Sequence, residues 1–327
     1  MTLNRRAALG LAALAATARP VAALTPVSLQ VAPPDPTEVI RLWPGVAPGG
    51  ERVTVTPTVT ERSTDPAFHD RFARYTTDPI LTVLRPAQPN GASLLLIPGG
   101  GYKWAVVDKE GLDCARVFAA AGVTCFVLRY RLPADGWAAG PDAPLQDAQR
   151  ALRLVRSQAA AHGLDPARVA VLGASAGGHL AGMLTARTDA TYAAVDETDG
   201  VSHRPDLSIL LYPAATMADP HVHAGSRLEL LGSTPTPEEI DRYSLERMDW
   251  SGRPPTFLLH AMDDAAVPVE NSLQLLATLR AAGVATEAHL FQEGGHGFGI
   301  RLIEGKPGAV WPQLALAWGA RHGWLGA

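Results

Sequence analysis

The sequence predicts an α/β fold in which a doubly wound, mostly parallel sheet is flanked by helices and carries small lid-like insertions. Two observations support this prediction. Short apolar stretches typical of buried strands alternate with longer stretches typical of helices after Gly101. The chain has 327 residues, 47% of them hydrophobic, and α/β folds of this size commonly form one domain with a large core. We therefore expect one folded domain over residues 37–327.

The N-terminal residues differ in composition from the rest of the chain. Asn4-Arg5-Arg6 precedes an alanine-rich apolar stretch, and Val21-Ala22-Ala23 supplies small residues at the spacing of a cleavage site. This pattern predicts a signal peptide over residues 1–23 and an exported, periplasmic protein, and the paired arginines resemble a twin-arginine signal. The alternative is an amphipathic or buried first helix. Residues 24–36, rich in Pro and Ala, are predicted to be a linker.

The first part of the domain is predicted to be rich in strands. Residues 52–60 alternate β-branched with other side chains, and residues 80–84 and 93–97 are short strand-like runs. From there on, strands and helices alternate, which indicates a parallel sheet. The further strands are expected over residues 123–128, 169–172, 207–211, 256–260 and 286–291, and the helices over residues 110–121, 145–162, 178–186, 272–282 and 309–320.

Two longer segments, residues 189–205 and 214–255, interrupt the alternation. Long connections in a compact domain usually have a function, and both segments lie near strands whose carboxyl ends should border a ligand site. We expect them to form a lid and the walls of a pocket. No stretch after the N-terminal residues is long and apolar enough to predict a membrane span.

Charge, cysteine and histidine content narrow the classes of function. The formal net charge is −4, and no run of Lys or Arg after the N-terminal segment predicts a basic patch, so we expect no nucleic-acid partner. Cys114 and Cys125 are either one disulfide or two small buried side chains. No cluster has convincing zinc-ligand spacing, and His221-Val222-His223 is interpreted as a polar loop. We expect no metal and no other cofactor.

The strongest local signal is Gly173-Ala174-Ser175-Ala176-Gly177, which follows a short apolar strand and opens a helical stretch. A serine on such a sharp turn needs small neighbours, because a side chain at either glycine would collide with the adjoining strand or helix. The turn also places Ser175 at a helix N-terminus, where free N–H groups favour a developing negative charge. The pattern therefore predicts Ser175 as a nucleophile.

A serine nucleophile requires a base and an orienting acid, and both follow in the order Ser, Asp, His. Asp264 comes after the strand at 256–260, and His296 lies in Gly294-Gly295-His296-Gly297-Phe298 after the last predicted strand. We expect His296 to accept the Ser175 proton and Asp264 to fix the imidazole tautomer. Asp263 is the alternative acid. We prefer Asp264 because Asp264-Ala265-Ala266-Val267-Pro268 resembles the acid loop of many α/β-hydrolases.

The third requirement is an oxyanion hole, the set of N–H donors that binds the negative oxygen of a tetrahedral intermediate. Ile97-Pro98-Gly99-Gly100-Gly101-Tyr102 supplies consecutive glycines directly after a predicted strand. Glycines let backbone N–H groups approach a substrate closely. We expect the donors to be Gly100, Gly101 and Ala176, the residue after the nucleophile. The alternative is that the glycines form an ordinary flexible turn.

From about Ile40 to its C-terminus, the chain resembles the acetylesterase and carbohydrate (xylan) esterase branch of the α/β-hydrolase superfamily, related to hormone-sensitive-lipase-like esterases. Such a resemblance implies metal-free serine hydrolysis of small acyl esters, commonly acetyl groups on plant polysaccharide fragments such as acetylated xylo-oligosaccharides. Besides the triad, the resemblance rests on Leu42-Trp43-Pro44-Gly45-Val46-Ala47-Pro48-Gly49, the Pro98–Tyr102 loop, Tyr130-Arg131-Leu132, Ser175-Ala176-Gly177-Gly178-His179-Leu180 and Gly225-Ser226-Arg227-Leu228-Glu229-Leu230-Leu231-Gly232.

One position departs from the lipase-like pattern: Pro98 stands before the glycines where those relatives usually carry histidine. The departure favours the sugar-esterase branch. Tyr102 and Trp104, just after the glycines, are candidates for stacking on a sugar ring in the substrate pocket, or else structural supports.

Three other functions compete with this prediction. A feruloyl or general short-chain esterase would share the mechanism. A prolyl-oligopeptidase-like peptidase would share the triad order, but too few residues precede Ile97 for the propeller that such enzymes place there. A non-catalytic binding module would be expected to lack part of the triad or the glycine loop, and all parts are present.

Overall fold

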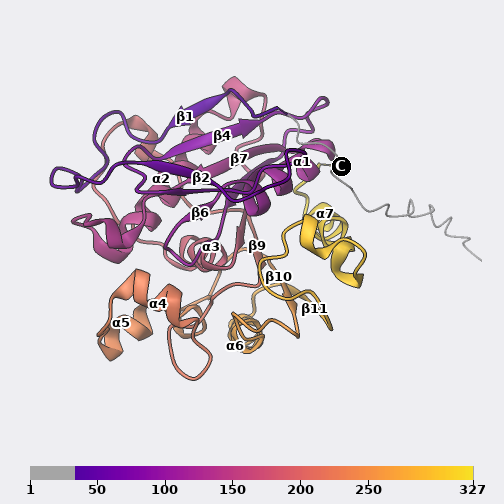
Figure 1. Ribbon diagram of the computed structural model, residues 1–327. Helices are drawn as coiled ribbons and strands as arrows, with labels where there is room; N and C mark the ends of the chain where they lie inside the picture. Colours follow the sequence, from indigo (N-terminus) through magenta and orange to yellow (C-terminus); the bar gives the residue numbers. More distant parts are fainter. Residues whose placement is uncertain (1–33, 327) are drawn as a thin grey trace, which may run out of the picture.

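The computed structural model describes residues 34–326 (Figure 1). The predicted signal peptide and most of the predicted linker therefore lie outside the described residues. Within residues 34–326, none of the helices is both long and apolar enough to cross a membrane.

An eight-stranded sheet forms the centre of the fold, in the order β1-β4-β7-β5-β8-β9-β10-β11 (Figure 1). All neighbours from β7 to β11 run parallel, whereas β1, β4 and β7 pair antiparallel. The predicted mostly parallel sheet is thus confirmed. The strands are β1 (Val39–Arg41), β4 (Ile80–Leu84), β5 (Ser93–Ile97), β7 (Thr124–Arg129), β8 (Val169–Ala174), β9 (Leu207–Leu211), β10 (Thr256–Ala261) and β11 (Thr286–Phe291).

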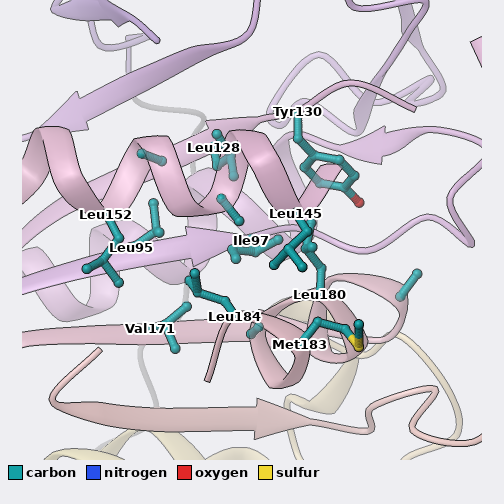
Figure 2. Close-up of a cluster of buried hydrophobic side chains, with 14 of the residues drawn as sticks. Leu95, Ile97, Leu128, Tyr130, Leu145, Leu152, Val171, Leu180, Met183 and Leu184 are labelled. Atoms are coloured by element: carbon teal, nitrogen blue, oxygen red, sulfur yellow. The ribbon is translucent and has the colours of Figure 1, made fainter. Parts of the chain in front are cut away.

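Helices cover both faces of this sheet. Successive side chains of a strand point to opposite faces, and the buried strands carry apolar residues on both. On β5, Leu95 and Ile97 join the core beneath α2, α3 and α6, while Leu94 and Leu96 join the core beneath α1 and α7. Figure 2 shows part of the first core, where Leu145 and Leu184 approach the strand side chains. The covering helices are α1 (Asp113–Ala120), α2 (Ala143–Ser157), α3 (Ala176–Ala186), α6 (Glu270–Ala281) and α7 (Trp311–Arg321).

The strand-rich opening differs from the prediction in detail. A small antiparallel sheet contains β2 (Thr58–Glu61), β3 (Arg71–Arg74) and β6 (Ala105–Val106). Of the strand expected over residues 52–60, only the last three residues belong to β2. The sequence pattern did not predict β1, β3 and β6, because strands this short have too few residues to show an apolar period.

The structure decides between the two alternatives for the cysteines and shows where the two insertions lie. Cys114 and Cys125 are free thiols, both buried in the core beneath α1 and α7. The segment 189–205 packs on α2 through ion pairs of Arg150 with Asp196 (2.5 Å) and of Arg153 with Asp199 (3.3 Å). The segment 214–255 forms α4 (Ala224–Leu231) and α5 (Pro237–Arg242), orange in Figure 1.

Candidate active site

Ser175 lies on the sharp turn that joins β8 to α3. Its backbone is strained, with φ of 56° and ψ of −122°, a conformation uncommon for a residue with a side chain. The two glycines of the motif permit this turn. A Cβ at Gly173 would lie 2.1 Å from the carbonyl oxygen of Gly177, and a Cβ at Gly177 would lie 2.1 Å from the carbonyl oxygen of Ile97. The collision expected at either glycine is confirmed.

The structure brings together the three side chains that the sequence predicts as a triad. They follow β8, β10 and β11, and parallel strands end at the same edge of a sheet. The Ser175 Oγ lies 2.8 Å from His296 Nε2, and His296 Nδ1 lies 2.6 Å from Asp264 Oδ2. Because an ionised carboxylate only accepts hydrogen bonds, Nδ1 carries the proton and Nε2 is free to accept one from Ser175.

Asp264, rather than its neighbour Asp263, faces His296. Asp264 is 7% exposed, and its Oδ1 accepts hydrogen bonds from the amides of Ala266 and Val267, each at 2.9 Å. Asp263 is exposed and accepts a hydrogen bond from the Gly295 amide at 2.8 Å, which ties down the loop that carries the histidine.

A second histidine, His260, lies behind Asp264, and no sequence motif predicted a role for it. It is fully buried, and its Nε2 lies 3.2 Å from Asp264 Oδ2 and 3.0 Å from the carbonyl oxygen of Val267. Since both neighbours are acceptors, Nε2 carries a proton and donates it. The Nδ1 atom lies 2.7 Å from Ser272 Oγ, which completes a buried line of hydrogen bonds.

The electrostatics of this line favour an ionised Asp264. Burial alone would raise the pKa of the carboxyl group, but the hydrogen bonds from His260 and His296 outweigh it and hold the pKa of Asp264 well below its ordinary value. The carboxylate is therefore negative at neutral pH.

The glycine loop is held against Ser175 by buried polar groups. The Tyr130 hydroxyl donates to the Pro98 carbonyl at 2.8 Å, and the Gly99 amide donates to Glu110 Oε2 at 3.0 Å. At Gly100, φ is 127° and a Cβ would lie 2.3 Å from the Trp104 carbonyl oxygen, so only glycine fits there.

The predicted oxyanion donors are free to bind a ligand. Within residues 34–326, the amides of Gly100 and Gly101 donate to no other residue, and both residues line the same pocket as Ser175. Ala176 opens α3, where helix amides lack intrahelical acceptors.

The two aromatic residues after the glycines have different positions. Tyr102 is only 1% exposed, and its hydroxyl lies 2.6 Å from Nδ1 of His179, whose Nε2 lies 2.6 Å from the Tyr243 carbonyl oxygen. Its position corrects the expectation that Tyr102 lines the substrate pocket, because the hydroxyl is drawn into the core by a buried acceptor. Trp104, in contrast, lines the pocket and packs against Phe72.

The pocket beside Ser175 has a volume of about 430 Å³ and is open to solvent. Of the two insertions, only the segment 214–255 contributes to its wall, so the expectation that 189–205 also does so is wrong: that segment is held on α2 by its ion pairs. The lining residues are Arg62, Gly100, Gly101, Lys103, Trp104, Val106, Lys109, Glu110, Ser175, His223, Gly225, Leu228, Glu229, His296 and Gly297.

The strand order, the serine on its turn and the aligned histidine and aspartate define a protein of the α/β-hydrolase class. The chain belongs to the family described as alpha/beta hydrolase fold, whose model matches residues 94–300. This family includes esterases, and the resemblance drawn from the sequence is confirmed.

Three similar proteins are named for hydrolysis of acetyl esters and xylosides, of acetylxylan and of xylan. The structure resembles that of an acetyl ester-xyloside bifunctional hydrolase from Caldicellulosiruptor lactoaceticus, with a TM-score of 0.71 and 32% identity, over 91% of this chain and 100% of that chain. The acetylxylan esterase of Xylanibacter ruminicola is 32% identical over 66% of this chain and 42% of its own length. Endo-1,4-beta-xylanase B of Butyrivibrio fibrisolvens is 35% identical over 63% of this chain and 32% of its own length. The chain thus spans less than half of either curated relative.

Proposed function

We propose that the protein is a serine carboxylesterase that removes small acyl groups, chiefly acetyl, from xylan-derived oligosaccharides. The proposal rests on the hydrogen bonds that connect buried Asp264 through His296 to Ser175, because Ser175 lines a pocket that is open to solvent. The substrate class comes from the relatives, which are named for acetylxylan, acetyl ester-xyloside and xylan hydrolysis.

In the first half of the reaction, Ser175 Oγ attacks the acyl carbonyl carbon while His296 Nε2 accepts the hydroxyl proton. The carbonyl oxygen becomes negative and is bound by amides from Gly100, Gly101 and Ala176, which need no reorganisation because the loop is already fixed. The tetrahedral intermediate then collapses. Its bond to the sugar oxygen breaks, and the proton on His296 passes to that oxygen, so that the alcohol leaves and the acyl group stays on Ser175.

In the second half, water attacks the acyl-enzyme and gives its proton to His296. The new tetrahedral intermediate releases the carboxylic acid, and the proton returns to Ser175 Oγ. Asp264 stabilises the imidazolium formed in both halves, because its carboxylate stays ionised beside Nδ1.

The pocket supports a sugar ester rather than a long-chain ester. Its volume lies within the range of small-molecule sites, and its lining includes charged and polar side chains beside Trp104. We propose that Trp104, half-exposed on the pocket wall, stacks on the ring that carries the ester.

We further propose that residues 37–327 form the catalytic domain and that residues 1–23 direct export to the periplasm. The paired arginines, the alanine-rich stretch and the small residues at 21–23 support this assignment.

The test is acetate release by the purified protein from acetylated xylo-oligosaccharides, beside 4-nitrophenyl acetate, 4-nitrophenyl butyrate and a feruloylated arabinoxylan fragment. We expect acetate release from the oligosaccharides and faster cleavage of the acetate than of the butyrate. Cleavage of the nitrophenyl esters alone would reject the sugar substrate and retain the mechanism. Faster release of ferulate than of acetate would favour the feruloyl alternative, and no cleavage of any ester would reject the proposed function.

His260 is expected to act on the reaction through Asp264. We predict that His260→Leu lowers kcat for 4-nitrophenyl acetate about tenfold, the effect of losing one hydrogen bond to a charged group, with a smaller change in KM. His260→Gln is the matched variant, because its amide can donate from the position of Nε2, and we expect it to recover most of the activity. Steady-state kinetics and urea unfolding of both variants check this result. Equal kcat losses in two variants that are folded would contradict it.

A further inference from the structure

His223 is a pocket residue that the proposed mechanism does not use. It lies on the insertion 214–255, at the position immediately before α4, and lines the pocket together with Ser175 and His296. Its ring carbon Cε1 would lie 3.8 Å from a Cβ placed on Gly101, so the imidazole borders the glycine loop.

The hydrogen bonds of His223 fix which of its ring nitrogens carries the proton. Nδ1 accepts the Ser226 amide at 3.0 Å as the cap of α4, and the Ser226 hydroxyl lies 2.8 Å from the same atom. An atom that accepts an N–H bond carries no proton, so the neutral ring has its proton on Nε2. Burial lowers the pKa of His223, which favours the neutral ring at neutral pH.

The Nε2–H group is therefore a fixed donor without an acceptor in the part of the chain that the structure describes. Nδ1 is held in the cap, so the imidazole cannot turn the other nitrogen toward the pocket without breaking two hydrogen bonds. The ring is half-buried rather than fully enclosed, and it belongs to the pocket lining. A ligand in the pocket is the acceptor that this geometry leaves room for.

We propose that His223 is a specificity-determining residue whose Nε2–H donates to a hydroxyl oxygen of the alcohol part of the substrate, so that the pocket selects esters of polyhydroxylated alcohols. The alcohol part is the relevant side because His296 must reach the leaving oxygen, and His223 shares the pocket with His296. This inference rests on the proposed esterase function and narrows its substrate class to esters with a free hydroxyl beside the ester oxygen.

The test uses two acetates that differ by one hydroxyl: trans-cyclohexane-1,2-diol monoacetate and cyclohexyl acetate. We expect the wild-type protein to prefer the diol monoacetate, and we expect His223→Asn to lower the ratio of the two kcat/KM values by about tenfold, which corresponds to one hydrogen bond. Asparagine is a good helix cap, so α4 keeps its first hydrogen bond while the donor at Nε2 is lost.

His221→Asn is the matched control, because it makes the same change two residues away at a side chain outside the pocket lining. We expect it to leave the ratio at the wild-type value. An unchanged ratio in His223→Asn, or an equal loss for both acetates, would overturn the role in alcohol selection while leaving the esterase function standing. Failure of the wild-type protein to hydrolyse either acetate would instead count against the proposed function itself, and circular dichroism excludes misfolding of the variant.

Discussion

Ser175→Ala is expected to lower kcat for 4-nitrophenyl acetate by about 10⁴-fold or more, because removal of the nucleophile leaves only the oxyanion donors and binding to favour the transition state. Within residues 34–326, the Ser175 side chain makes one hydrogen bond, to His296, so the stability should change by no more than about 1 kcal/mol. Steady-state kinetics and the midpoint of urea unfolding measure both quantities.

A covalent readout makes the Ser175 prediction independent of substrate choice. A fluorophosphonate reagent should label the wild-type protein on the peptide that contains Ser175, and it should not label the Ala variant. Ser226→Ala, which removes a hydroxyl near the same pocket, is the matched control and should still be labelled. Retained activity or labelling in a folded Ser175→Ala protein would reject the mechanism.

Asp264→Asn is expected to lower kcat by about 10³- to 10⁴-fold with little change in the fold, as the amide no longer holds His296 in the tautomer that accepts the serine proton. We expect a large effect on kcat because Asp264 Oδ2 bonds directly to Nδ1 of His296, at 2.6 Å. The kcat is measured with 4-nitrophenyl acetate between pH 6 and 9, where the low pKa of Asp264 keeps the wild-type carboxylate ionised.

Asp263→Asn is the matched control for this change, since it makes the same substitution at the neighbouring residue. In the described part of the chain, the Asp263 carboxylate accepts one hydrogen bond, from the Gly295 amide, and the asparagine side-chain oxygen can accept it as well. We expect less than about a tenfold loss of kcat. A larger loss in Asp263→Asn than in Asp264→Asn would show that Asp263 orients His296 and would contradict our assignment of Asp264.

Acidification provides a check on the state of Asp264 in the folded protein. Its pKa is lower in the folded than in the unfolded chain, so the carboxylate stabilises the fold above the unfolded-state pKa, which is about 4. That stabilisation is lost as the pH falls toward the folded-state pKa. The stabilisation is therefore fully present in the neutral range where the kinetic experiments are made.

Much of the site could be predicted from the sequence because its requirements are local. The two glycines around Ser175 are needed by the backbone of one turn, and the glycine loop directly follows β5, so both motifs carry their structural reason within a few residues. The order of strands and helices also follows from local apolar patterns, which explains why the parallel sheet was predicted and the three short strands were not.

Tertiary structure alone decided which neighbouring side chains face the reaction. Adjacent residues point in different directions, and the packing of distant elements determines which direction is buried. For this reason Asp264 rather than Asp263 meets His296, and Tyr102 turns into the core toward His179 instead of toward the pocket.

The same reason explains the two histidines that the sequence did not identify. No pattern in the sequence assigns a role to His260 or His223, and each is placed by a tertiary contact: with Asp264 for the former and with the start of α4 for the latter. The sequence by itself therefore determined the fold class, the nucleophile, its base and the glycine loop. The sequence favoured Asp264 over Asp263 as the orienting acid, and the packing of distant segments settled that choice. Only the packing determined what supports the acid and which side chains form the pocket wall, because those choices depend on directions in space that a linear pattern does not contain.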